Sequence, residues 1–243
     1  MRLLVLATAT ARAARFGRVL APVGLLGGAS LMSRARGKTI DYESLKGLPE
    51  SWAAEAAKHA LAGNTPTRSD GGYDIATFAG GCFWGVELRF QRVPGVIATA
   101  SGYVQGHKAE PTYKEVSARS TGHTEAVQLI FDPGVVSYAD LLEIYWDRLG
   151  DDATRANAVG NDRGPQYRSG VYALSDKQLA AAEASLSKRQ ERFAKPIATE
   201  VERQKGVFWP AEEYHQQYLA KGGRAGNPQS PAKGCTDTIR CYG

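Results

Sequence analysis

The sequence predicts an α+β fold, a two-layer α/β sandwich with a mixed central sheet. Three observations lead to this prediction. Apolar runs of strand length alternate with helix-length stretches of 3.6-residue periodicity. Gly and Pro turns separate these runs. The chain has 243 residues with 43% hydrophobic composition, which is enough for one domain with its own core plus extensions.

The first elements follow from periodicity and turn residues. Residues 73–78 form an apolar run of strand length, and residues 83–91 have helical spacing. Pro94-Gly95 then turns the chain into a strand over residues 96–103. Residues 126–131 alternate as a third strand, which an Asp-Pro-Gly turn ends.

Two serines mark the helices of the second half. Ser137 caps a helix over residues 138–149, with Asp140 as its capping-box partner. Ser175 caps a long helix over residues 177–193. The remaining predicted elements are two strands and a last short helix, at 170–174, 198–204 and 211–219. Strands interspersed with helices in this order predict two layers, of the ferredoxin-like plait type.

The first 40 residues differ in composition from the rest. They contain seven basic residues and no Asp or Glu, as in organelle transit peptides, so we expect import into a plastid or mitochondrion. The apolar stretch 19–32 contains Pro22 and is too short to span a membrane, so no membrane association is expected. The formal net charge of +5 includes those seven residues, which leaves about −2 for the remainder. The folded part therefore shows no basic footprint for nucleic acid.

The rest of the chain divides into three predicted parts. Residues 41–72 form an N-terminal extension that ends in a Gly/Pro/Ser-rich linker. Residues 73–220 form the catalytic domain. Residues 221–243 form a flexible tail rich in Gly, Pro, Ser and Lys. No surplus apolar face is apparent, so we expect a monomer.

Cysteine placement indicates thiol chemistry. Cys82 lies in Gly80-Gly81-Cys82-Phe83-Trp84-Gly85, between a predicted strand and a predicted helix, whereas Cys235 and Cys241 lie in the tail. Three cysteines are too few, and of the wrong parity, for a disulfide scaffold. A helix N-terminus favours the thiolate form of Cys82, and two tail thiols are available to resolve an oxidised Cys82. A buried, unreactive Cys82 beside core aromatics is the alternative.

Other polar residues are ambiguous from position alone. Tyr103 and Tyr167 are compatible with core tyrosines, Glu125 with a solvated edge charge, and Asp162 with a turn residue. The four histidines form no metal-spaced set with the cysteines, so no metal site is expected. No phosphate loop or dinucleotide fingerprint occurs, and no cofactor is expected.

Several separated motifs occur together in one order. Besides the Cys82 run, they are Pro94-Gly95-Val96, Ser101-Gly102-Tyr103, Thr121-Gly122-His123-Thr124-Glu125, Gly160-Asn161-Asp162-Arg163-Gly164, Gln166-Tyr167-Arg168-Ser169 and Ala211-Glu212-Glu213-Tyr214-His215. In this order they resemble the peptide methionine sulfoxide reductase type A family, over about residues 73–243. One departure is that many relatives have a His-Asp-Pro-Thr stretch where this chain has residues 149–154.

The resemblance implies a role for each matching residue. Cys82 would attack the sulfoxide sulfur, and Phe83 and Trp84 would hold the substrate methyl group. Glu125 would protonate the sulfoxide oxygen, because that oxygen leaves poorly until it is protonated. Hydroxyls of the matching tyrosines would point at the same oxygen, with a carboxylate nearby; these residues are Tyr103, Tyr167 and Asp162.

The resemblance also implies how the enzyme is recycled. The tail resembles that of photosynthetic-lineage members, so Cys82 would form a disulfide with Cys235 or Cys241 and exchange it to the other. Thioredoxin would then reduce the final disulfide. The implied substrates are methionine-S-sulfoxide in oxidised proteins and as the free amino acid, in protein repair. A static Cys235–Cys241 clasp is the alternative for the tail.

Two other functions stay open at this stage. The first is a cysteine hydrolase with Cys82 as nucleophile and His123 or His215 as base, which requires a thiolate–imidazole pair. The second is a non-enzymatic redox switch in which Cys82 only forms a disulfide. The hydrolase gives no task to Cys235 and Cys241, and the switch gives none to Glu125.

Overall fold

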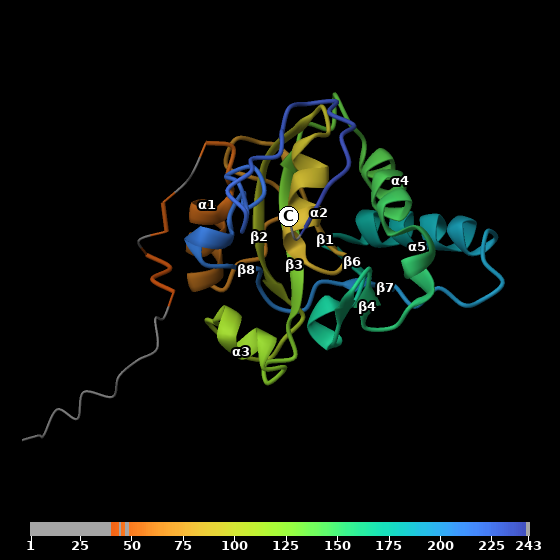
Figure 1. Ribbon diagram of the computed structural model, residues 1–243, viewed down its shortest axis with the longest axis horizontal. Helices are drawn as coiled ribbons and strands as arrows, with labels where there is room; N and C mark the ends of the chain where they lie inside the picture. Colours follow the sequence, from red (N-terminus) through yellow and green to blue (C-terminus); the bar gives the residue numbers. More distant parts are fainter. Residues whose placement is uncertain (1–39, 44, 47–48, 242–243) are drawn as a thin grey trace, which may run out of the picture. The chain divides into compact units, whose positions relative to one another are not determined.

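A six-stranded sheet forms the centre of the fold (Figure 1) in the computed structural model, which describes residues 40–43, 45–46 and 49–241. The strand order is β7-β6-β1-β3-β2-β8, and all neighbours are antiparallel except β6 and β7. The six strands are β1 (Asp74–Ala79), β2 (Val96–Val104), β3 (Thr124–Phe131), β6 (Gly170–Ala173), β7 (Glu200–Arg203) and β8 (Trp209–Pro210). A separate hairpin joins β4 (Ala158–Val159) to β5 (Asp162–Arg163).

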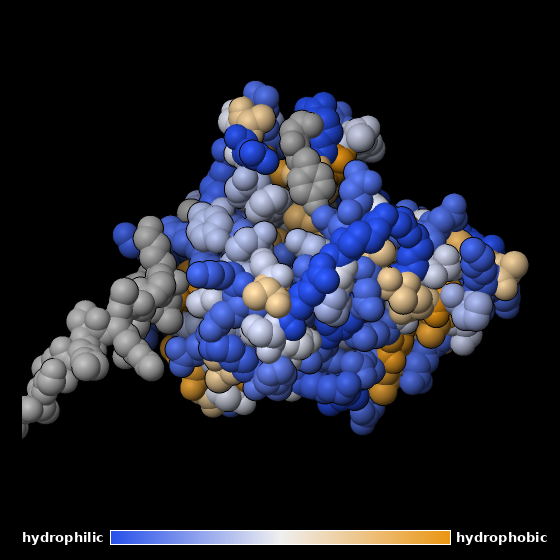
Figure 2. Space-filling view, turned by 60° about the horizontal axis from the view of Figure 1, so that its bottom comes forward, coloured by the Kyte–Doolittle hydropathy of each residue, from blue (hydrophilic) through white to orange (hydrophobic). Residues whose placement is uncertain are grey.

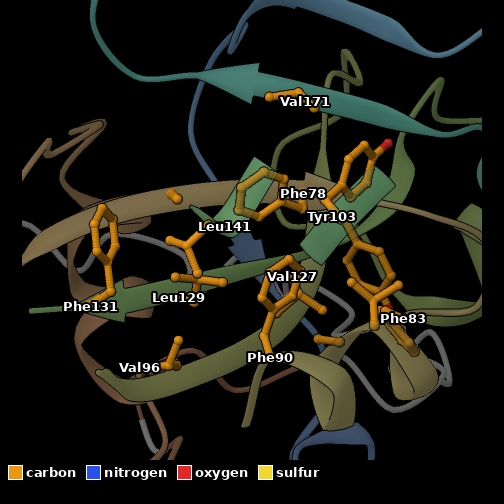
Figure 3. Close-up of a cluster of buried hydrophobic side chains, with 14 of the residues drawn as sticks. Phe78, Phe83, Phe90, Val96, Tyr103, Val127, Leu129, Phe131, Leu141 and Val171 are labelled. Carbon is orange, nitrogen blue, oxygen red and sulfur yellow. The ribbon is translucent and has the colours of Figure 1, made fainter. Parts of the chain in front are cut away.

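Alternating side chains give the sheet two buried faces. Phe78, Val127 and Leu129 belong to a core on one face, whereas Ile75 and Ile130 belong to a second core cluster. Figure 3 shows the first of these clusters, with aromatic and branched side chains from the sheet and from a helix pointing toward one another. Every residue of β3 is buried, and apolar side chains lie on both of its faces.

The helices cover the two faces unequally. The first core includes residues of α2 (Phe83–Gln91) and α4 (Tyr138–Leu149), whereas α1 (Ala53–Leu61) contributes residues to both cores. Figure 1 shows α2 in front of the middle of the sheet. The other helices are α3 (Tyr113–Ser117), α5 (Asp176–Gln190) and the 3-10 turns η1 (Gly150–Thr154), η2 (Pro165–Tyr167) and η3 (Glu213–His215).

Most sequence-predicted elements are confirmed. The helices predicted at 83–91 and 138–149 have those bounds, and Ser137 and Asp140 form the capping box. The mixed, mostly antiparallel sheet with helices packed on it agrees with the predicted α+β class. The helix predicted at 211–219 is wrong, because only the single 3-10 turn η3 forms there.

The two ends of the chain complete the description. The predicted leader, residues 1–40, lies outside the described residues except for Ile40. Residues 229–241 of the tail make hydrogen bonds to α2, to its C-terminal flank and to one another. Of the described helices, none is long and apolar enough to cross a membrane.

Candidate active site

Cys82 is placed by a tight turn between β1 and α2. It is the N-cap residue of α2, and its side chain is buried. The turn depends on Gly81, which has φ of +76°, a conformation that L side chains rarely adopt. A Cβ atom on Gly81 would also come within 2.8 Å of Val159. The glycines before Cys82 therefore allow a sharp turn that sets the thiol at the start of a helix.

The thiol opens into a cavity of about 190 Å³. This volume suits the end of one side chain rather than a large ligand. The cavity is lined by Cys82, Phe83, Trp84, Tyr113, Glu125, Tyr167, Tyr218, Arg224 and Cys241. The structure thus brings together five of the predicted site residues that precede the tail, together with one of the two tail cysteines.

Glu125 contributes a buried acid to this cavity. It lies on β3 and is 2% exposed. Its Oε2 accepts a hydrogen bond of 3.1 Å from the backbone N–H of Phe83. Burial raises the pKa of Glu125 to about 8, although the Phe83 hydrogen bond opposes this shift. Glu125 is therefore mainly protonated at neutral pH and can donate a proton.

The Cys82 thiol behaves differently from the expectation based on the helix N-terminus. Burial, and then the nearby Glu125, raise the pKa of Cys82 well above its ordinary value. A hydrogen bond from the Trp84 backbone acts in the opposite direction but is outweighed. Desolvation of a thiolate thus outweighs the favourable end of α2. The resting site holds a neutral thiol beside a neutral carboxylic acid.

Aromatic rings form the wall beside the thiol. The Trp84 ring stacks on Tyr218 with centroids 3.8 Å apart. The Trp84 Nε1–H donates to His215 Nδ1 at 3.0 Å, and the Phe83 ring lies 5.0 Å from the His215 ring. Burial lowers the pKa of His215 to about 3, so this imidazole is neutral. The wall is therefore apolar and rigid, as a methyl-binding surface requires.

The tyrosines differ from the sequence expectation. Tyr167 lines the cavity, but Tyr103 does not, because its hydroxyl donates to Glu212 Oε2 at 2.9 Å. Tyr113, which sequence reasoning missed, lines the cavity instead, together with Tyr167. Tyr113 begins α3, whose capping box is formed by Thr112 and Glu115. That Thr-x-x-Glu signal was readable in the sequence.

Asp162 supports the turn rather than lining the cavity. Its Oδ2 accepts a hydrogen bond of 3.3 Å from the backbone N–H of Cys82. Asp162 lies on β5 of the small hairpin, and its charge contributes to the raised pKa of Glu125. Asp162 therefore fixes the backbone of the thiol residue and favours the protonated acid.

The comparisons with known proteins show the family of this chain. A profile of the family "Peptide methionine sulfoxide reductase" matches residues 74–237. The chain belongs to this family. A protein of this name from Fragaria ananassa is 49% identical over 185 residues, covering 76% of this chain and 95% of that protein. "Peptide methionine sulfoxide reductase A4, chloroplastic" from Oryza sativa subsp. japonica is 51% identical over 176 residues, which cover 72% of this chain and 66% of that protein.

A solved structure supports the same assignment. Methionine sulfoxide reductase A of Corynebacterium diphtheriae is 30% identical to this chain, with a TM-score of 0.59. The match covers 65% of this chain and 82% of that structure's chain. The fold and the family thus agree between sequence and structure comparison.

The two tail cysteines are placed unequally in this reductase. Cys241 lines the same cavity as Cys82, whereas Cys235 does not, and all three cysteines are free thiols. Burial raises the pKa of Cys241, and the guanidinium of Arg148 opposes that shift. Arg148 itself is held by a 2.9 Å hydrogen bond from its Nη1 to Gly80 O.

The hydrolase alternative lacks its catalytic pair. Within the described residues, neither His123 nor His215 hydrogen-bonds the Cys82 thiol. Burial lowers the pKa of His123 to about 4, and its Nδ1 has no hydrogen-bond partner among the described residues. No group of three His, Cys, Asp or Glu side chains that could hold a metal ion occurs in the part of the chain that the structure describes.

Proposed function

We propose that this family member reduces methionine-S-sulfoxide, free or in oxidised proteins, to methionine, and so repairs oxidised proteins. One observation carries the proposal. Cys82 and the protonated Glu125 open into the same small cavity, which aromatic rings wall on one side. A nucleophile and a proton donor at one small site are what reduction of a sulfoxide requires.

The proposed reaction transfers oxygen from one sulfur to another. Glu125 donates its proton to the sulfoxide oxygen, and the Cys82 sulfur attacks the substrate sulfur. The protonated oxygen then moves as a hydroxyl group from the substrate sulfur to the Cys82 sulfur, and the bond between the two sulfurs breaks. The thioether is released, and Cys82 becomes a sulfenic acid. The thiol proton of Cys82 restores the proton on Glu125. The substrate sulfur gains two electrons and the Cys82 sulfur loses two.

Aromatic and hydroxyl groups position the substrate. We assign the methyl group to the Phe83 and Trp84 wall, which Tyr218 and His215 hold in place. Tyr113 and Tyr167 take the role of hydrogen-bonding the sulfoxide oxygen, because both line the cavity. With the acid on one side and the methyl wall on the other, only one sulfur epimer can be bound productively. We assign the S epimer.

Recycling uses the tail thiols in a defined order. The position of Cys241 in the cavity supports it as the first to attack the sulfenic acid of Cys82. Cys235 would then attack that disulfide at the Cys241 sulfur and release Cys82 as a thiol. The resulting Cys235–Cys241 disulfide would lie on the tail, within reach of a dithiol reductant, and we assign thioredoxin to this role.

The first test is stereochemical. The protein from residue 40 onward is incubated with a racemic methionine sulfoxide derivative and dithiothreitol. Chiral chromatography then measures the amount of each sulfur epimer that remains. Loss of the S epimer alone supports the proposed reaction. Persistence of both epimers, with folded protein and a titratable Cys82 thiol, would overturn it.

We propose that residues 1–40 direct the protein into the plastid. The acid-free, Arg-rich residues 1–40 support import into an organelle, and a related rice protein is named as chloroplastic. A fluorescent protein fused after residues 1–40 should co-localise with chlorophyll in a photosynthetic cell. Co-localisation with a mitochondrial marker instead would contradict the assignment.

A ferredoxin-like plait and a monomeric state are also proposed. The order β6-β1-β3-β2, with α2 between β1 and β2 and α4 between β3 and β6, supports the plait. Exposed large apolar residues come from separate segments, and Figure 2 shows a mainly hydrophilic face, which supports a monomer. Sedimentation equilibrium tests the monomer, and an experimental structure with another strand order would contradict the plait.

A further inference from the structure

The tail runs back along the helix that carries Cys82. At the C-terminal end of α2, the backbone N–H of Gly234 donates to Arg92 O at 2.7 Å. At the N-terminal end, Cys241 lies against Gly85, where a Cβ atom would come within 2.5 Å of the Cys241 Sγ. Figure 1 shows the tail, in the blue of the C-terminus, crossing α2. One helix therefore positions both thiols of the first disulfide.

The base of the tail is held by two cationic side chains. Lys233 Nζ donates to Gln91 O and to Val96 O, both at 2.7 Å. The buried Arg92 side chain donates to Ser230 O at 2.8 Å and to Asp237 O at 2.5 Å. Hydrogen bonds from charged donors are the stronger kind, and a buried one is costly to break. We call these two residues the base clamp.

The tip of the tail is held by one amide side chain. Gln229 Oε1 accepts from the Arg240 N–H at 2.9 Å, and Gln229 Nε2 donates to Arg240 O at 2.7 Å. The Gln229 backbone N–H is itself fixed on Leu219 O at 3.0 Å. This pair fixes both backbone polar groups of the residue directly before Cys241. Both hydrogen bonds are neutral and exposed, so they open more easily than the base clamp.

We propose that Gln229 is a positioning residue for the resolving step, which holds the Arg240 backbone so that Cys241 stays at the cavity of Cys82. This inference rests on the proposed function, because it concerns the fate of the Cys82 sulfenic acid. Holding two reacting groups together replaces an encounter of a loose chain end with a local reaction. Gln229 does not line the substrate cavity.

The base clamp and the Gln229–Arg240 pair have different roles in the two disulfide steps. In the first step, the Cys241 thiol attacks the sulfenic sulfur of Cys82, forming the disulfide and releasing water. In the second, the Cys235 thiol attacks the Cys241 sulfur, and Cys82 leaves with the proton. The first step requires the tip of the tail to be held by Gln229, so that Cys241 stays beside Cys82. The second requires the tip to open so that residues 238–241 fold back on Cys235, while the base clamp, which reaches as far as Asp237, stays closed.

The test separates the resolving step from sulfoxide reduction. A Cys235→Ser background allows only the Cys82–Cys241 disulfide to form. Gln229→Met keeps the volume of the side chain and removes both hydrogen bonds. The exposed Thr238→Ala, at a position in the same segment without a hydrogen bond among the described residues, is the matched control. Rapid quenching then gives methionine formed in the first turnover, sulfenic acid trapped by dimedone, and disulfide by intact mass.

We expect Gln229→Met to form one equivalent of methionine at the control rate, while disulfide formation slows by about tenfold or more. Trapped sulfenic acid should accumulate in the same interval. With Cys235 restored, exchange to Cys235–Cys241 should not be slowed in Gln229→Met. It should be slowed in Lys233→Met, which removes the Lys233 part of the base clamp.

Two results would overturn the inference. One is disulfide formation in Gln229→Met at the rate of Thr238→Ala. The other is an equal slowing of methionine formation and disulfide formation, which would indicate a general structural effect. Absence of methionine from every variant, the Cys235→Ser parent included, would contradict the proposed function instead.

Discussion

The backbone N–H of Phe83 donates a 3.1 Å hydrogen bond to Glu125 Oε2. This bond joins the first turn of the helix that carries the thiol to the strand that carries the acid. Burial nevertheless raises the pKa of Glu125 to about 8, so the carboxyl group accepts this bond while keeping its proton at neutral pH. The Phe83 bond fixes the position of the acid, and desolvation fixes its protonation state.

Replacing Glu125 by Gln should remove the proton donor while keeping the hydrogen-bond acceptor for Phe83. We expect kcat/KM for methionine-S-sulfoxide to fall roughly 10²–10⁴-fold, the usual contribution of a positioned acid. Steady-state kinetics with dithiothreitol measure this effect. A fall of less than about threefold would show that Glu125 is not the acid.

The same group predicts how activity depends on pH. The proton-donor form of Glu125 is lost as the pH rises through about 8, so kcat/KM of the wild-type enzyme should fall above that value. The descending limb should be absent in Glu125→Gln. A limb that persists in that variant at the same pH would assign it to another group.

Tyr113 and Tyr103 should respond differently to removal of the hydroxyl. Tyr113→Phe removes a group from the cavity and should lower kcat/KM by about tenfold with little loss of stability. Tyr103→Phe leaves Glu212 without one donor and should lower the free energy of unfolding by about 1–2 kcal/mol. Denaturant unfolding and steady-state kinetics of both variants distinguish the two roles. A loss of kcat/KM in Tyr103→Phe, with unchanged kcat/KM in Tyr113→Phe, would show that Tyr103 acts in the site and Tyr113 does not.

Cys241 and Cys235 should give different intermediates when replaced. Cys241→Ser should accumulate the Cys82 sulfenic acid, whereas Cys235→Ser should accumulate the Cys82–Cys241 disulfide. The double variant should turn over with small thiols but not with thioredoxin. Mass spectrometry after one turnover identifies each species. Thioredoxin-dependent turnover by the double variant would contradict the recycling scheme.

Glu87 should make stability depend on pH. It lies fully buried on α2 and accepts hydrogen bonds from Thr99 Oγ1, Ser101 Oγ and the Gln217 N–H. Burial raises its pKa from 4.5 to about 7, with Lys221 as the charged neighbour that opposes the shift. A carboxyl with a raised folded-state pKa stabilises the fold below about pH 4.5, and that stability is lost as the pH rises through about 7.

Glu87→Gln should remove this dependence while keeping a hydrogen-bonding partner for each neighbour. Between about pH 4.5 and 7, the wild-type free energy of unfolding should decline relative to the variant by on the order of 3 kcal/mol. Urea unfolding at a series of pH values measures the difference. Parallel stability curves for the two proteins would exclude Glu87 as the titrating group.

Local signals explain why much of the fold was predictable. The Ser137–Asp140 capping box fixes where α4 begins, and the glycines before Cys82 fix the turn into α2. Each depends on residues only a few positions apart, so the sequence displays it directly. The family motifs likewise placed Glu125 and Tyr167 at the cavity that contains Cys82.

The parts that were missed depend on long-range contacts. Tyr103 lies opposite Glu125 in the β2–β3 register, so a role beside it was reasonable, but Glu212, distant in sequence, engages its hydroxyl. Tyr113 reaches the cavity from α3, which has only five residues and is too short for periodicity to reveal. Similarly, nothing local to Lys233 shows that its ammonium meets the end of α2.

The protonated state of Cys82 affects how readily the enzyme is itself oxidised by peroxides. Peroxides that oxidise methionine also oxidise cysteine, and they react with the thiolate rather than the thiol. Because burial and Glu125 raise the pKa of Cys82, little thiolate is present at neutral pH. We therefore expect Cys82 to react slowly with peroxide, whereas a sulfoxide brings an oxygen that Glu125 can protonate. A repair enzyme with this chemistry can remain reduced under the conditions that damage its substrates.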